Sequence, residues 1–263
     1  MKDLPKGLAT SGATRIAKRL RSISGGKVLD VATGGGGFIE TLMEALKDYD
    51  SFVGIDNSRE EVEYANKRFE GQPVEIMEMD AEALEFEDGF FDTVCISFSL
   101  HHLDRIDKVL AEMKRVLKSG GYFIIQEMYC DGRQTEAQRT DILQHHWDAE
   151  IDSLLGVSHN KTLTKQEIKD VVNNLELKEV EVLESTHYVK CLSCEDKFKC
   201  EDPKNEEIIN QSIKEIDDAL DRLRKHSDLK VRNGLMEEGE KLRERVKEFG
   251  SAPASNLFII AKK

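Results

Sequence analysis

The sequence lacks most of what a membrane-spanning, secreted or nucleic-acid-coating protein needs. No apolar run is long enough to cross a bilayer, and the charged first twenty residues contain no apolar signal core. Basic residues are scarce, with 38 Lys and Arg against 51 Asp and Glu, which disfavours nucleic acid as a partner. Five cysteines, an odd number, indicate reduced thiols. We therefore expect a cytoplasmic protein with no membrane span.

The remaining composition is that of a folded globular chain. Hydrophobic residues make up 39% of the sequence and charged residues 34%, whereas a disordered chain would be poorer in apolar groups. A length of 263 residues suits one large domain with a sizeable insertion.

Short apolar runs alternate with helical patterns along most of the chain. We expect seven strands, at residues 27–33, 51–56, 73–77, 92–98, 122–126, 177–189 and 256–261. Helical patterns lie between them, at 13–22, 38–46, 58–69, from 106 to the glycines at 120 and 121, at 134–155, and after the capping box at Thr164. This alternation predicts an α/β, Rossmann-like fold, with a mostly parallel seven-stranded sheet flanked by helices.

The composition changes before the last strand. Half of the residues from 201 to 250 are charged, and the apolar ones recur at helical spacings of three and four. This pattern predicts a helical hairpin with a narrow apolar seam. We expect one α/β domain at 1–190 with 251–263, and a helical insertion at 191–250 that is a lid or a dimer contact.

A glycine-rich turn after the first predicted strand carries the strongest chemical signal. The run Val28–Gly37 ends in four glycines, and its small residues let the backbone turn sharply and pass close to a ligand. NAD, FAD and phosphate sites use such turns too, so a nicotinamide-dependent oxidoreductase stays open. However, Asp30 lies inside the strand before the glycines, where a dinucleotide site normally has glycine or an apolar residue.

Two more carboxylates follow the next strands. Asp56 comes twenty residues after Gly36, which suits a carboxylate that accepts both ribose hydroxyls. The pair Asp80–Ala81 follows the third strand, where a carboxylate can accept a hydrogen bond from an adenine amine. Asp30 and the pair Asp80–Ala81 therefore disfavour a nicotinamide-dependent oxidoreductase.

These residues, the run Phe91–Leu103 and the segment Val116–Ile125 together resemble the class I S-adenosylmethionine-dependent methyltransferases. The resemblance covers about residues 13–130, and the nearest branch includes the ubiquinone and menaquinone C-methyltransferases. Ser119 stands where that branch has proline. The resemblance implies methyl transfer from S-adenosylmethionine to a small-molecule acceptor by in-line displacement, with S-adenosylhomocysteine as the product.

The resemblance also implies a cofactor-binding role for eleven residues. Asp30 orients the loop and the methionine amino end of the cofactor, and the backbone-rich pocket is lined by Ala32, Thr33, Gly34 and Gly36. Asp56 binds ribose, and the adenine is held by Asn57, Asp80 and Ala81. Ser97 and Phe98 lie below the sulfonium.

Catalysis needs little beyond this placement, because the methyl group of a sulfonium is already activated. His101 follows the fourth strand and could act as a general base, although it could equally cap the next helix or wall the pocket. The topology brings the segments after the fifth and sixth strands to the cofactor side. If these segments form a lid over the methyl acceptor, we expect the residues that line the acceptor pocket (the acceptor wall) to include Tyr129, His145, His146, Trp147 and Tyr188.

The cysteines leave one further alternative. His187, Cys191, Cys194 and Cys200 are ligands that zinc accepts, but their spacing matches no zinc motif, so we expect free thiols and no metal. A non-catalytic cofactor-binding protein, with the charged hairpin as its partner surface, is the other rival to the enzyme.

Overall fold

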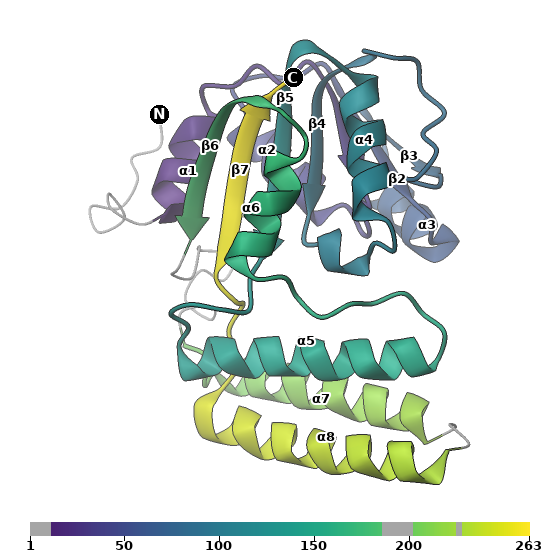
Figure 1. Cartoon of the computed structure of the whole chain (residues 1–263), viewed down its shortest axis with the longest axis vertical. Helices are drawn as coiled ribbons and strands as arrows, with labels where there is room; N and C mark the ends of the chain where they lie inside the picture. Colours follow the sequence, from purple (N-terminus) through teal and green to yellow (C-terminus); the bar gives the residue numbers. More distant parts are fainter. Residues whose placement is uncertain (1–11, 186–201, 225–227) are drawn as a thin grey trace.

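The protein is described by a computed structural model that covers residues 12–185, 202–224 and 228–263 (Figure 1). Seven strands form one sheet. They are β1 (Lys27–Val31), β2 (Ser51–Asp56), β3 (Val74–Glu78), β4 (Phe91–Ser97), β5 (Leu117–Met128), β6 (Lys178–Ser185) and β7 (Asn256–Lys262).

The strand order is β3-β2-β1-β4-β5-β7-β6. The pairs from β3 to β5 are all parallel, whereas β7 runs antiparallel to both β5 and β6. The sheet is therefore mixed, and the predicted Rossmann-like architecture is confirmed in this form. The strand order reverses between β1 and β4, and open α/β sheets bind ligands outside the carboxyl ends of the strands at such a point.

Helices cover both faces of the sheet. One face packs against α4 (Ile106–Val116) and α6 (Lys165–Asn173). The other packs against α1 (Gly12–Leu20), α2 (Gly37–Ala45) and α3 (Arg59–Arg68). Because strand residues alternate between these two cores, the central strands carry apolar residues at successive positions, as the sequence predicted.

Three long helices form a separate layer beyond the ends of the strands (Figure 1). They are α5 (Glu136–Leu154), α7 (Glu206–Leu223) and α8 (Leu229–Phe249). Trp147 and Ile151 of α5 pack into one apolar core with Ile216 of α7 and Val246 of α8. The predicted hairpin thus packs with a third helix, α5, which we expected to belong to the first domain.

One predicted boundary was wrong. Helix α4 ends at Val116 and β5 begins at Leu117, whereas the sequence predicted that the helix continued to Gly120. The N–H of Gly120 bonds the carbonyl of Lys263, and a Cβ on Gly121 would lie 2.7 Å from the carbonyl oxygen of Asp92. These glycines therefore allow close backbone pairing instead of stopping a helix. None of the helices in the described residues is long and apolar enough to span a bilayer.

Candidate cofactor site

A cavity of about 610 Å³ lies at the carboxyl ends of β1, β2 and β4. Seven of the eleven predicted cofactor residues line it: Ala32, Gly34, Asp56, Asn57, Asp80, Ala81 and Phe98. Strand register explains this gathering. Val31 pairs with Ile55 on one side and with Ile96 on the other, so the residues that follow these three strands meet at one edge.

The other predicted residues lie behind this lining. Asp30 is buried, and its Oδ2 accepts a hydrogen bond from the hydroxyl of Thr33 (2.6 Å). Gly36 adopts a φ of +83° at the start of α2, and a Cβ there would lie 2.3 Å from the ring of Phe69. The hydroxyl of Ser97 donates to Gln126 Oε1 (3.4 Å). Asp30, Thr33 and Gly36 therefore shape the turn, and Gln126 is the partner of Ser97.

Asp56 fixes the loops on both sides of the cavity. Its Oδ2 accepts from the N–H of Gly34 (2.8 Å), and its Oδ1 accepts from the N–H of Ser58 (2.9 Å). Each carboxylate oxygen can accept two hydrogen bonds, so one acceptor position on each oxygen remains for a ligand. This geometry fits a pair of ribose hydroxyls.

Two side-chain-bearing residues in the lining have left-handed backbone. Ala32 has a φ of +53° and Phe98 a φ of +49°, at the ends of β1 and β4. This conformation costs about 1–2 kcal/mol for a residue with a Cβ, and such strain concentrates at functional sites. Its occurrence on the two strands that flank the order reversal supports a binding site between them.

The Asp30 carboxyl has an unusual acidity. Burial raises its pKa to about 7, against the lowering effect of hydrogen bonds from Thr33 and Cys95. The Sγ of Cys95 lies 3.3 Å from Asp30 Oδ1, and burial also raises the pKa of this thiol. Asp30 is therefore partly protonated near neutral pH, and a cation brought close to it would favour the ionised form.

Several lining residues were not predicted. They are Ile55, Glu61, Met79, Glu82, Ser99, His102, Leu103, Asp104, Val109, Val157 and Ser158. Most follow a strand end that the sequence had already marked, so proximity in sequence could have found them. Val157 and Ser158 come from the loop after α5, for which the sequence carries no pattern.

Histidines gather beside this cavity. His101 is buried and its Nδ1 lies 2.9 Å from Glu127 Oε1, while its neighbour His102 is exposed and lines the cavity. His159 arrives from the loop after α5, with its Nδ1 2.8 Å from Asp152 Oδ2. Partial loss of solvation in the histidine cluster, together with the neighbouring imidazoles, lowers the pKa of His102 to about 3 and that of His145 to about 4.

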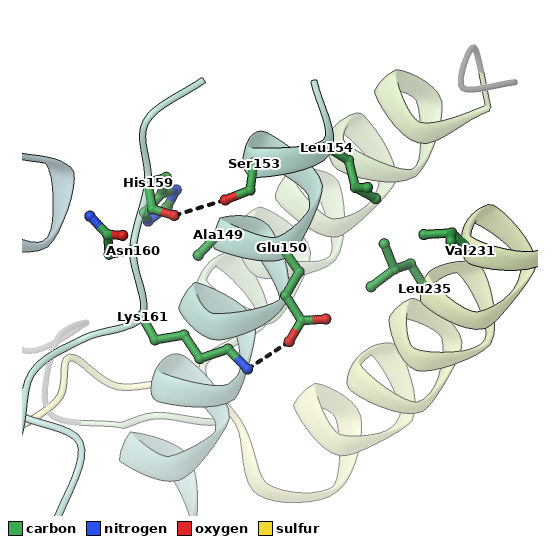
Figure 2. Close-up of a pocket in the computed structure, with 9 residues that line it drawn as sticks. All are labelled: Ala149, Glu150, Ser153, Leu154, His159, Asn160, Lys161, Val231 and Leu235. Carbon is green, nitrogen blue, oxygen red and sulfur yellow. Dashed lines mark hydrogen bonds and ion pairs between the residues drawn. The ribbon is translucent and has the colours of Figure 1, made fainter. Parts of the chain in front are cut away.

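The loop that carries His159 is held in place from two sides. The N–H of Asn160 donates to the carbonyl of His101 (2.7 Å), which ties the loop to the end of β4. On its other side lies a second cavity, of about 500 Å³, bounded by α5 and α8 (Figure 2). There Ser153 bonds the carbonyl of His159, and Lys161 pairs with Glu150 (2.6 Å), as Figure 2 shows.

The predicted acceptor-wall residues do not gather at the cofactor cavity. Tyr129 is buried and donates its hydroxyl to Glu184, and Trp147 belongs to the helical core. His146 bonds Thr162 (2.7 Å), and the ring of His145 lies 5.9 Å from that of His101. None of these four lines the cavity. Tyr188 and the group His187, Cys191, Cys194 and Cys200 lie outside the described residues.

The cavity and its loops match a known domain family. The profile of the "Methyltransferase domain" family matches residues 29–125. The ubiquinone/menaquinone biosynthesis C-methyltransferase of Desulfotalea psychrophila is 43% identical over 96 residues, which are 36% of this chain and 39% of that protein. The demethylmenaquinone methyltransferase of Renibacterium salmoninarum is 35% identical over 130 residues, or 48% and 53% of the two chains.

Solved structures extend the likeness to nearly the whole fold. The phosphoethanolamine N-methyltransferase 2 of Haemonchus contortus, solved with S-adenosyl-L-methionine, has a TM-score of 0.53 at 19% identity, over 95% of this chain and 52% of that one. The [4+2]-cyclase SpnF has a TM-score of 0.58 at 15% identity, over 95% and 80%. Since a cyclase shares the fold, the fold by itself does not define the reaction.

Residues 29–125 are therefore similar to a methyltransferase domain. The relatives that match this stretch are named as ubiquinone and menaquinone C-methyltransferases, so the resemblance read from the sequence is confirmed. The match spans only about 40–50% of the length of these relatives.

Proposed function

We propose that the protein is an S-adenosylmethionine-dependent methyltransferase that acts on a small molecule. The observation that carries this proposal is the cavity between β1 and β4. It joins the carboxylates of Asp56 and Asp80 to the strained turns at Ala32 and Phe98. Relatives named as quinone C-methyltransferases support a small acceptor. The sulfonium supplies an activated methyl group when the cofactor is bound.

The residues of this chain would act by holding and orienting. Asp56 would accept hydrogen bonds from the ribose hydroxyls while it keeps the loops at Gly34 and Ser58 in place. Asp80 and Ala81 at the rim would hold the adenine edge, and Phe98 would lie under the sulfonium. An acceptor held in line at about 3–3.5 Å from the methyl carbon needs no further activation of the donor.

The predicted general base has less support than the cofactor site. His101 is buried, faces Glu127 and does not line the cavity, so an acceptor proton would have to reach it through another group. The cytoplasmic location, the absence of a nucleic-acid partner and a homodimer through the helical layer stay predictions, as does the division at residues 190 and 251.

Ligand-induced stabilisation tests the proposal and its rivals. We expect S-adenosylmethionine and S-adenosylhomocysteine, each at a hundred times its Kd, to raise the melting midpoint by about 5–10 °C. NADH should leave it unchanged. A rise with NADH alone would favour the oxidoreductase, whereas tight adenosyl binding without turnover on an acceptor panel would favour a non-catalytic binding protein.

One matched pair of variants locates the binding. Asp56→Asn removes the charge at the carboxyl end of β2, and Asp50→Asn makes the same change just before its other end. Charged hydrogen bonds contribute about 1.5–3 kcal/mol, so Asp56→Asn should weaken S-adenosylhomocysteine binding about 10- to 100-fold. Asp50→Asn should bind as the unmodified protein does. Equal affinity of the two variants would place the ribose elsewhere.

A further inference from the structure

Three histidines beside the cofactor cavity, His101, His102 and His159, lie close to one another. The rings of His102 and His159 have centroids 4.2 Å apart, and those of His101 and His102 are 4.3 Å apart. Each of the three offers one ring nitrogen, and these nitrogens all lie within 4.8 Å of one another. They come from two segments that are 57 residues apart in the chain and are tied together by the Asn160–His101 backbone bond.

Two carboxylates, the buried Glu127 and the partly buried Asp152, fix which nitrogen each ring presents. Glu127 faces His101 Nδ1 and Asp152 faces His159 Nδ1, so in the neutral imidazoles the Nδ1 atoms carry the protons. The Nε2 atoms then keep their lone pairs. Metal-ligating histidines are held in this way, because a carboxylate on the second nitrogen sets the ring and raises its basicity.

Two buried polar groups at the cluster, His159 Nε2 and the Glu127 carboxylate, also indicate a cation site. His159 Nε2 is buried and has no hydrogen-bond partner among the described residues. Glu127 is fully buried, and its hydrogen-bond partners among the described residues are His101 and the backbone N–H groups of Leu100 and Met128, with no Lys or Arg among them. A buried carboxylate is normally paired with a cation or placed near a metal. A cation bound by the three rings would serve both groups.

We infer that His101, His102 and His159 form a binding site for a divalent transition metal ion of the zinc type. Imidazole nitrogens suit zinc, copper, nickel and iron, whereas magnesium and calcium prefer oxygen. Tetrahedral zinc with bonds of about 2.1 Å holds its nitrogens about 3.4 Å apart, so the rings need to close by about an ångström. Three protein ligands leave a position for water or substrate, as in catalytic zinc sites.

The place of the site suggests what the metal would bind next. His102 lines the cofactor cavity, so a metal held by it lies at the cavity wall. If the protein is a methyltransferase as proposed above, the remaining position would take an anionic oxygen of the acceptor. His101 would then be a metal ligand and not a general base. The metal site itself does not depend on that proposal.

Metal binding to the full chain tests the inference. After treatment with a chelator, the protein is titrated with Zn²⁺ by calorimetry and with Co²⁺ by visible absorption. We expect one ion per chain, and a Co²⁺ spectrum without a thiolate charge-transfer band. No stoichiometric binding would overturn the inference. So would a thiolate band, which would assign the ion to cysteine ligands in place of the histidines.

Three variants test whether Zn²⁺ binds at the histidine cluster or at histidines elsewhere in the protein. His102→Asn removes an exposed ligand and should weaken Zn²⁺ binding more than about 100-fold, since a lost orienting partner alone costs about 10- to 100-fold. Asp152→Asn should weaken it about 10- to 100-fold. His146→Gln, which removes a histidine bonded to Thr162 and outside the cluster, should bind as the unmodified protein does. Unchanged binding in His102→Asn overturns the inference.

S-adenosylhomocysteine binding, measured on the same preparations, keeps the two proposals apart. Asp152→Asn, at a residue that does not line the cofactor cavity, should still bind the cofactor product, which shows that this variant is folded. Zinc binding without S-adenosylhomocysteine binding in the unmodified protein would refute the methyltransferase and leave the metal site. The reverse result would refute the metal site alone.

Discussion

The buried carboxyl of Asp30 should make the stability of the protein fall as the pH rises. Burial raises the pKa of this group from 3.8 to about 7. Below pH 3.8 the carboxyl is protonated in both the folded and the unfolded chain. Between pH 3.8 and 7 only the unfolded chain gives up the proton, so rising pH favours unfolding. Above pH 7 the group is ionised in both states and its contribution becomes constant.

Asp30→Asn isolates this effect. The amide has the same shape, its oxygen can accept from Thr33 as the carboxylate does, and it does not ionise. From pH 5 to pH 8 the unmodified protein should lose about 3 kcal/mol of unfolding free energy relative to Asp30→Asn, given these two pKa values. Most of the change should occur below pH 7.

Urea unfolding followed by far-UV circular dichroism at pH 5, 6, 7 and 8 measures the difference. Asp50→Asn, an exposed site, is the control and should follow the unmodified protein to within about 0.5 kcal/mol at every pH. If the curves for the unmodified protein and Asp30→Asn run parallel across this range, the Asp30 carboxyl has the same charge in the folded and unfolded chain. The reasoning from burial would then be wrong.

Two further matched pairs test the packing around the site. Gly36→Ala should cost at least about 2 kcal/mol in urea unfolding, because it adds left-handed strain and a clash with the ring that ends α3, whereas Gly37→Ala has open space and should cost less than about 0.5 kcal/mol. Trp147→Ala should cost about 3–5 kcal/mol, because the indole fills the helical core, and Leu143→Ala, at an exposed leucine one turn earlier, should cost less than about 0.5 kcal/mol. Equal costs within either pair would contradict the packing described here.

The sheet was predictable because its signal is local. A strand buried between two helical layers must be apolar at successive positions, and a run such as Val28–Val31 meets this need almost without exception. The carboxyl end of such a strand is where ligands bind, so the carboxylates at 30, 56 and 80 could be predicted with it. The apolar pattern of α7 and α8 was also a local signal. Such a pattern shows that a helix has an apolar face, but it does not show which segment packs against that face. That partner, α5, lies more than fifty residues earlier.

The histidine cluster could not be predicted, because its members meet through tertiary contacts. His101 and His102 are adjacent in the sequence. His159 lies in a loop with no periodicity, and only the hydrogen bond between Asn160 and His101 brings it to them. Glu127 follows the apolar run Phe123–Ile125 of β5 closely, and a fully buried acid is unusual, so it was a local signal of a polar partner nearby.

Charged side chains connect the helical layer to this cluster. Arg222 of α7 donates to Asp152 of α5, and Asp152 in turn holds the ring of His159. Burial alone would raise the pKa of Asp152, but the hydrogen bonds from His159 and Arg222 keep it below its usual value, so the carboxylate stays ionised. The charge-rich insertion therefore does more than cover apolar surface or keep the chain soluble. By fixing one carboxylate, α7 sets the orientation of a histidine that faces the other two beside the cofactor cavity.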